Sequence, residues 1–315
     1  MNENLPPSRS VEQDLGAFSL GAFSLGASTD RKCPICKSDA RLWRSVRSYG
    51  IAECEKCFHR FLAEPVASNH VERIYGDDYF FGGGAGYSNY LDQSLLLRGR
   101  GRDYARQMKK YRATPGKVLD VGAAAGFLLE GWIDEGWHGV GVEPNRAMCK
   151  HAEGRGINVR CGIVEHENLE SEGPFDLISM VQVISHLPEP VESIRNLVRL
   201  LSPSGLLLVE TWDRLSWFAR MCGTGWHEYS PPSVLHWFTP KTLELAATTC
   251  GLRPVASGKV LRWLQVGHAK SLLEHAGKES ALMRMAHWIV TPLPGRWSVP
   301  YPGDDLRWAL FQKPN

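Results

Sequence analysis

The sequence has no apolar run long enough to cross a membrane and no basic leader of the kind that directs export. Its longest apolar stretches, such as Gly205 to Val209, are far shorter than the roughly 20 residues that a membrane-spanning helix needs. Acidic residues flank the N-terminal segment, whereas a secretory signal requires a basic start. We therefore expect a cytoplasmic protein with no membrane segment.

The sequence also lacks an excess of either charge, because 36 Lys and Arg nearly balance 34 Asp and Glu and leave a formal net charge of +2. Two stretches are nevertheless basic. Residues 31–62 hold eight Lys or Arg against three Asp or Glu, and residues 98–112 hold seven against one. An anionic or carrier-linked partner is compatible with these stretches, and so are ordinary solvated faces of a small domain and a helix.

Cysteines are few outside one cluster. Two Cys-x-x-Cys pairs, separated by 17 residues, have the spacing of a zinc ribbon. The four cysteines are Cys33, Cys36, Cys54 and Cys57. Four thiolates fill a tetrahedral Zn²⁺ and leave no position for substrate, so the spacing predicts a structural zinc rather than a catalytic one.

The chain divides into four predicted regions. Residues 1–30 contain the repeat Gly-Ala-Phe-Ser-Leu and are expected to form a flexible tail, with a short docking segment as the alternative. The zinc ribbon occupies residues 31–62, and a linker with a helical lid occupies 63–114. The catalytic domain is expected over 115–315, with inserted lid segments near 212–238 and 261–300.

Strand and helix patterns alternate from Lys117 onward, which predicts an α/β domain with a parallel sheet. Small residues follow the first strand in the turn from Gly122 to Gly126, where backbone amides at a helix N-terminus can approach a ligand closely. Glu143 ends the second strand, where a carboxylate can accept hydrogen bonds from both hydroxyls of a ribose. A nicotinamide site would instead favour Gly-x-Gly-x-x-Gly.

This pattern resembles the class I S-adenosylmethionine-dependent methyltransferases, whose first motif is Asp-x-Gly-x-Gly-x-Gly. Asp120, Gly122 and Gly126 match the motif, and Ala124 replaces its central glycine. The resemblance continues to about Gly251 and implies a Rossmann-like sheet with an antiparallel last strand.

The same resemblance implies the residues that contact the cofactor. Ile163 is expected beside the adenine, with Val181 and Gln182 beneath the cofactor. The expected set comprises Asp120, Gly122, Ala124, Gly126, Phe127, Glu143, Pro144, Gly162, Ile163, Val181 and Gln182, with Tyr79, Tyr87 and Tyr90 covering the cofactor.

Two histidines are candidates for the general base that methyl transfer to a hydroxyl or acidic carbon needs. His186 follows the fourth strand at the position where ubiquinone-type O-methyltransferases and sugar C-methyltransferases carry a histidine. A positioning role or a core histidine are the alternatives. His236 lies in an aromatic-rich stretch that resembles a substrate lid, although such a stretch can equally be a hydrophobic cluster.

The sequence therefore predicts a methyltransferase that modifies oxygen or carbon of a small molecule, such as a natural-product intermediate, a sugar or a phenol. The alternative is a zinc-ribbon methyltransferase that modifies bases of ribosomal or transfer RNA. The basic stretches favour RNA, whereas the near-neutral overall charge and the aromatic segment favour a small acceptor, which we prefer.

Overall fold

The computed structural model describes most of the chain from residue 31 onward. The described residues are 31–67, 70–81, 90–112, 114–164, 169–260, 263–267, 270, 281–295, 297–300 and 303–315. The predicted tail over residues 1–30 and the cofactor-covering candidate Tyr87 lie outside them.

The main sheet has seven strands in the order β11-β14-β9-β8-β5-β6-β7. The strands are β5 (Lys117–Val121), β6 (His138–Glu143), β7 (Val159–Cys161), β8 (Phe175–Val181), β9 (Leu201–Trp212), β11 (Arg253–Lys259) and β14 (Leu306–Gln312). Strands β7, β6, β5, β8 and β9 pair in parallel, whereas β14 runs antiparallel between β9 and β11. This arrangement confirms the predicted α/β fold with an antiparallel last strand.

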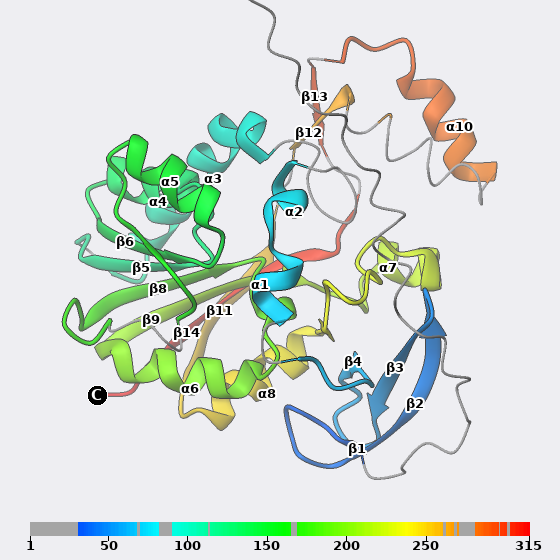
Figure 1. The fold of residues 1–315 in the computed structure, drawn as a ribbon, viewed down its shortest axis with the longest axis horizontal. Helices are drawn as coiled ribbons and strands as arrows, with labels where there is room; N and C mark the ends of the chain where they lie inside the picture. The colour runs from blue at the N-terminus through cyan, green and yellow to red at the C-terminus, as the bar shows by residue number, and fades with distance from the viewer. Residues whose placement is uncertain are drawn as a thin grey trace, which may run out of the picture.

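Helices cover both faces of this sheet, which explains why most residues of its central strands β5 and β8 are buried. One face carries α3 (Ser94–Met108), α4 (Phe127–Asp134) and α5 (Arg146–Gly154), and the other carries α6 (Pro190–Leu200) and α8 (Pro240–Thr249) (Figure 1). Helix α8 begins at a capping box in which Thr239 and Thr242 satisfy each other's backbone amides. Because β5, β6, β8 and β9 run parallel, their carboxyl ends lie along the same edge of the sheet.

The ribbon, residues 31–62, forms a second, antiparallel sheet that is extended by a strand from the main domain. Its strands are β1 (Arg31–Lys32), β2 (Asp39–Val46), β3 (Tyr49–Cys54) and β4 (Arg60–Leu62). A fifth strand, β10 (His236–Trp237), pairs with β4 and places His236 opposite Phe61. The sequence did not predict this pairing, because a two-residue strand has no periodicity of its own.

Short elements connect these parts. Between the ribbon and α3 lie α1 (His70–Ile74), α2 (Asp77–Phe81) and the 3-10 turn η3 (Tyr90–Gln93). Between β8 and β10 lie η4 (Ile184–His186), α7 (Trp217–Cys222) and η5 (Gly223–Gly225). In the expected insertion near 261–300 the structure has β12 (Trp263–Gln265), α10 (Ala281–Val290) and β13 (Ser298–Pro300), with β12 and β13 paired. Within the described ranges, no helix combines the length and apolar character needed to span a bilayer.

The aromatic stretch over residues 212–238 is mostly interior packing rather than a surface lid. Trp226, Tyr229 and Trp237 are buried together with Val46 and Ile51 of the ribbon. The hydrophobic-cluster interpretation therefore describes these side chains, because β10 draws them between the ribbon and the main domain. Trp217, by contrast, has 65% of its surface exposed.

Candidate active site

The turn after β5 has the backbone shape of a ligand-binding loop. Gly122, Ala124 and Gly126 all adopt positive φ angles, of 71°, 46° and 77°. Left-handed backbone suits glycine but costs an alanine about 1–2 kcal/mol. Ala124 therefore occupies a glycine-like conformation at the position where it departs from the motif.

The carboxylate of Glu143 holds this loop in place from the neighbouring strand. Its Oε2 accepts a hydrogen bond from the Ala124 amide at 2.9 Å, and its Oε1 accepts one from the Asn145 amide at 2.8 Å. Each carboxylate oxygen has a second lone pair. The acid can therefore keep the loop closed and still accept hydrogen bonds from a ligand.

Two carboxyls near this turn have raised pKa values. Burial raises the pKa of Glu143 to about 7, although the amides of Asn145 and Ala124 oppose the shift. Burial likewise raises the pKa of Asp120 to about 7, against a lowering hydrogen bond from Ser179 and with a further increase from the charge of Glu143. Both groups therefore titrate near neutral pH.

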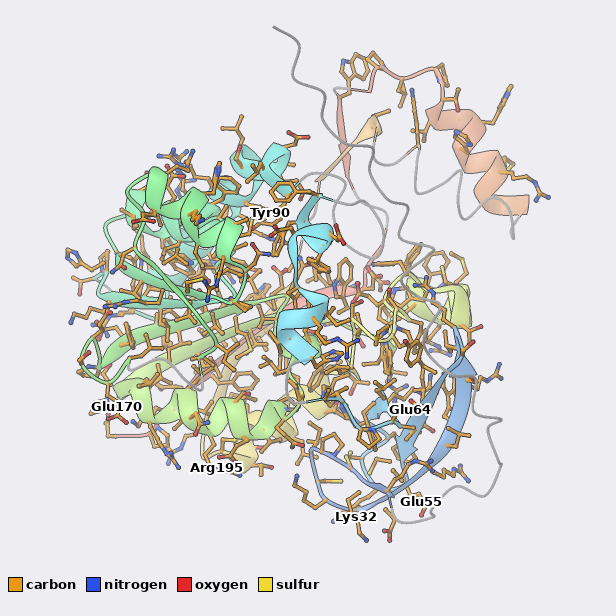
Figure 2. All side chains as sticks on the ribbon, viewed as in Figure 1. Lys32, Glu55, Glu64, Tyr90, Glu170 and Arg195 are labelled. Carbon is orange, nitrogen blue, oxygen red and sulfur yellow. The ribbon has the colours of Figure 1, made fainter. Side chains whose placement is uncertain are left out.

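Aromatic side chains from the preceding segment pack over this loop. Tyr90 stacks on Phe127 of α4 with ring centroids 5.8 Å apart, and Figure 2 labels its position beside the helices of this face. Tyr79 contacts the same cluster through Phe80, which is buried against Ala124 and Phe127. The structure thus brings Tyr79 and Tyr90 to the predicted cofactor loop.

Asn145, which the sequence analysis did not single out, joins the covering segment to the loop. Its side-chain oxygen accepts from the Met148 amide at 2.9 Å and caps α5. Its side-chain amide donates to the Tyr75 carbonyl at 3.0 Å and to the Asp77 carboxylate at 3.1 Å. The signal that could have revealed the cap is an Asn directly before a helical pattern.

The other predicted cofactor residues lie at the carboxyl ends of neighbouring strands, partly accessible to solvent. These residues are Pro144, Gly162, Ile163, Val181 and Gln182. Gln182 has a φ of 59°, and its side-chain amide donates to the buried Glu210 at 3.0 Å. Tyr104 of α3 also donates to Glu210, so this cluster ties α3 to the edge where the site lies.

His186 is held at the same edge by its neighbours. Its Nδ1 lies 2.7 Å from the carbonyl oxygen of Ser233, and the Tyr75 hydroxyl donates to that same oxygen at 2.8 Å. The Tyr75 ring packs edge-on against the imidazole at 5.4 Å. Burial lowers the pKa of His186 more than the carbonyls of Ser233 and Gln182 raise it, so the ring is neutral at pH 7.

His236 lies in a different environment from the one expected of a lid residue. It is 4% exposed, and its Nδ1 is 3.2 Å from Nε2 of the fully buried His59 of the ribbon. Burial lowers the pKa of His236 to about 4 and holds that of His59 well below its usual value. The two neutral rings form a link between ribbon and domain, which argues against His236 as a base.

The four ribbon cysteines converge as a zinc site requires. All four sulfur atoms lie within 4.8 Å of one another, and three of their separations are 3.4, 3.5 and 3.6 Å. A tetrahedral site with Zn–S bonds of about 2.3 Å needs sulfur separations of about 3.8 Å. The cluster is therefore compatible with a structural Zn²⁺.

The basic stretch over residues 98–112 is largely engaged by acidic groups of α4 and its C-terminal end. Arg98 and Arg102 both contact Asp134 at 2.7 Å, and Arg106 contacts Glu135 at 2.9 Å. These contacts support the interpretation of this stretch as an ordinary helix face. Because its arginines are paired with acidic groups, this stretch no longer favours RNA as the substrate.

Comparisons with known proteins agree with this arrangement. The model of a methyltransferase domain matches residues 96–257, just over half of the chain. Among curated proteins, a ubiquinone biosynthesis O-methyltransferase of Caulobacter sp. (strain K31) is 30% identical over 132 residues, or 40% of this chain and 50% of that protein. The protein of the same name from Caulobacter vibrioides is 27% identical over 188 residues, or 58% and 66%. The chain thus spans half to two thirds of the length of these relatives.

Solved structures include similar folds at low identity. An S-adenosylmethionine-dependent methyltransferase from Archaeoglobus fulgidus is 19% identical with a TM-score of 0.46, covering 71% of this chain and 99% of that one. The N-methyltransferase NodS of Bradyrhizobium japonicum, in complex with S-adenosylhomocysteine, is 14% identical with a TM-score of 0.44, covering 70% and 88%. From the family match and the observed sheet order, the chain belongs to the S-adenosylmethionine-dependent methyltransferase domains.

Proposed function

We propose that this protein transfers a methyl group from S-adenosylmethionine to oxygen or carbon of a small-molecule acceptor, with His186 as general base. The observation that carries the proposal is the placement of His186, a neutral imidazole fixed at the edge of the sheet where the glycine-rich turn and Glu143 also lie. The names of the curated relatives, which are O-methyltransferases of ubiquinone biosynthesis, point toward a phenol-like acceptor.

The cofactor would lie over the turn from Gly122 to Gly126, with its ribose hydroxyls donating to the free lone pairs of Glu143. The carboxyl ends of β7 and β8 would then place Ile163 beside the adenine and Gln182 beneath the cofactor. Tyr79 and Tyr90, which pack over the turn, would exclude water from above. Asn145 would keep this cover attached through Tyr75 and Asp77.

His186 would remove the proton from the acceptor. Donation of its Nδ1 proton to the Ser233 carbonyl fixes the tautomer that keeps Nε2 as the basic nitrogen. The bound cofactor supplies an electrophilic methyl group on a sulfonium. The chain's own contribution is to align the acceptor with that methyl and to accept one proton at His186, which the Ser233 carbonyl then stabilises in the charged form.

A structural Zn²⁺ held by the four ribbon cysteines is part of this proposal. It would fix the turn that carries His59 and so support the junction with β10. Metal analysis of the purified protein is expected to give about one zinc per chain. A metal-free protein whose four ribbon thiols are alkylated in the native state would contradict the assignment.

The acceptor class can be tested with an isotope-labelled methyl donor. We would incubate the protein with small-molecule extracts in one arm and with transfer and ribosomal RNA in the other. The proposal predicts label in an extractable small molecule that disappears with His186→Ala. Label confined to RNA would contradict it and favour the RNA-modifying alternative, for which the exposed basic residues of β2 would be the natural contact.

A further inference from the structure

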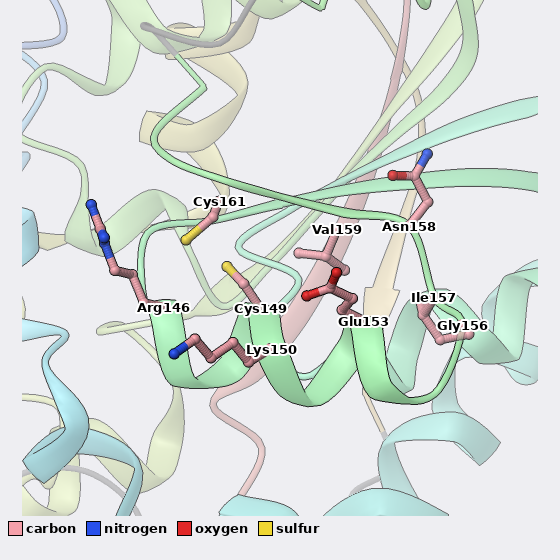
Figure 3. A pocket seen from close by; sticks show the side chains of 9 residues that line it. All are labelled: Arg146, Cys149, Lys150, Glu153, Gly156, Ile157, Asn158, Val159 and Cys161. Carbon is pink, nitrogen blue, oxygen red and sulfur yellow. The ribbon is translucent and has the colours of Figure 1, made fainter.

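A cavity of about 610 Å³ lies at the outer edge of the main sheet, between α5 and β7. Figure 3 shows its lining, with Arg146 and Lys150 on the helix and Asn158 and Val159 on the strand side. It is separate from the edge that holds His186, which does not line it. The proposed methyl transfer gives this cavity no role.

Two thiols meet in this cavity. The sulfur atoms of Cys149 on α5 and Cys161 at the end of β7 point toward one another in Figure 3. Burial raises the pKa of the Cys149 thiol, and the neighbouring Cys161 thiol raises it further. Cys161 is exposed, whereas Cys149 is buried. One thiol is therefore open to a reagent, and its neighbour is sheltered behind it.

The thiol pair is built into the proposed cofactor site. Cys161 is the register partner of Glu143, and the next residue, Gly162, donates its amide to the Glu143 carbonyl at 2.9 Å. The Cys149 thiol donates to that same carbonyl at 3.2 Å. A change in either thiol thus acts on the backbone of the acid proposed to bind the ribose and on the turn that carries Ile163.

We propose that Cys149 and Cys161 form a reversible disulfide that weakens cofactor binding, so that a peroxide switches the enzyme down and a dithiol restores it. The effect on the cofactor rests on the proposed function, whereas formation of the disulfide does not.

The reaction balances with hydrogen peroxide as the oxidant. The Cys161 thiol gives up its proton as its sulfur attacks one peroxide oxygen, the O–O bond breaks, and the leaving hydroxide takes up that proton, so that a sulfenic acid and water result. The sulfur of the Cys149 thiol then attacks the sulfenic sulfur, an S–S bond forms, the S–O bond breaks, and the leaving hydroxide takes the Cys149 proton to give a second water. Two thiols lose two electrons in total, and the two peroxide oxygens gain them.

Closing the bond has two mechanical consequences. The two sulfurs, which are free thiols here, must approach to about 2.05 Å, and this draws the end of β7 toward α5. The Glu143 carbonyl also loses the Cys149 donor. Linkage requires that the cofactor opposes oxidation by the same factor by which oxidation weakens the cofactor. A tenfold effect corresponds to a shift of about 30 mV in the potential of the thiol pair.

The test uses the full chain with its ribbon metal retained. After peroxide treatment and trypsin digestion without reductant, mass spectrometry should find peptide 147–150 linked to peptide 161–195. Calorimetry with S-adenosylhomocysteine should then show about tenfold weaker binding, restored by a dithiol. Cys161→Ser, which removes the exposed thiol, should have the same affinity for S-adenosylhomocysteine before and after peroxide treatment. Cys250→Ser is the matched control, because the Cys250 thiol also donates to a backbone carbonyl, that of Val191, at 3.3 Å, and it should respond like wild type.

Two results would overturn the inference. One is absence of the linked peptides at peroxide doses that oxidise other thiols of the same chain, and the other is a linked protein with unchanged affinity. If the reduced wild type does not bind S-adenosylhomocysteine, the proposed function fails and the cofactor effect fails with it. The linked peptides would still decide whether the disulfide forms.

Discussion

The two histidines His186 and His236 are close in the fold, yet their surroundings differ in kind. The Leu235 amide donates to the Ser185 carbonyl at 2.9 Å, so the two chain segments are adjacent. The strand that carries His236 pairs with β4, and the His236 ring contacts the imidazole of His59. His186 is fixed at one nitrogen and remains partly exposed. The comparison teaches that a base needs one anchored and one available nitrogen, whereas two neutral rings in an apolar interior form a structural link.

The largest expected effect is on the stability of the junction between the ribbon and the main domain, where His236 lies. Removing zinc, by chelation or by Cys54→Ser, should unfold the ribbon, because structural zinc contributes about 10–16 kcal/mol of folding free energy in small ribbons. Strand β10 would lose its partner β4, so melting of the whole chain should shift to lower temperature. Cys222→Ser, which changes a thiol outside the cluster, should melt like wild type. Unchanged hydrogen exchange in β4 and β10 of the zinc-free protein would contradict this view.

The next effect concerns chemistry at His186. His186→Ala should lower turnover about 10²- to 10⁴-fold, the usual contribution of a general base, while leaving affinity for S-adenosylhomocysteine nearly unchanged. Initial rates with a labelled methyl donor and calorimetry measure the two quantities separately. His227→Ala serves as the matched control, because this ring is 40% exposed and packs on Trp212 and Trp226 instead of Tyr75.

His236→Ala should behave in the opposite way. It leaves His59 buried without its partner, so unfolding free energy should fall by about 1–3 kcal/mol, while the folded fraction turns over normally. Denaturant titration and rates normalised to folded protein check this. Loss of turnover in His236→Ala alone, with His186→Ala active, would reverse the assignment of the base.

A smaller effect is expected on cofactor affinity when Glu143 is changed. Glu143→Ala removes two charge-assisted acceptors for the ribose, which should weaken S-adenosylhomocysteine binding by about 1.5–3 kcal/mol. Because the same side chain also holds the Ala124 and Asn145 amides, Glu143→Gln is the gentler companion variant. Wild-type affinity in both variants would show that the ribose is bound elsewhere.

The smallest effect is expected at Ala124. Ala124→Gly relieves the left-handed backbone but gains freedom in the unfolded chain, so stability should rise by less than about 1 kcal/mol. The neighbouring Ala125→Gly, at a position without positive φ, should instead destabilise the protein by about 0.5–1 kcal/mol. Equal destabilisation by both variants in denaturant titrations would contradict the strain at Ala124.

The sequence predicted those parts of the molecule that local patterns encode. The cysteine spacing, the alternating strands and the turn from Gly122 to Gly126 each depend on residues a few positions apart. The pairing of β10 with β4 joins residues about 175 positions apart and has no local signal. For the same reason Asn145, Tyr75 and the His59–His236 pair gained their roles only when tertiary contacts were known.

The central claim is that Glu143 and the turn after β5 bind the cofactor, and calorimetric titration with S-adenosylhomocysteine from pH 6 to pH 9 tests it most directly. The pKa of Glu143 is raised to about 7 by burial, and only the ionised carboxylate accepts hydrogen bonds at both oxygens. Affinity should therefore fall as pH drops through 7, by up to about tenfold per unit below it, and Glu143→Gln should flatten this profile. Binding with one ligand per chain and this pH dependence is the predicted result. Absence of binding at pH 8, or a wild-type profile as flat as that of Glu143→Gln, would contradict the account.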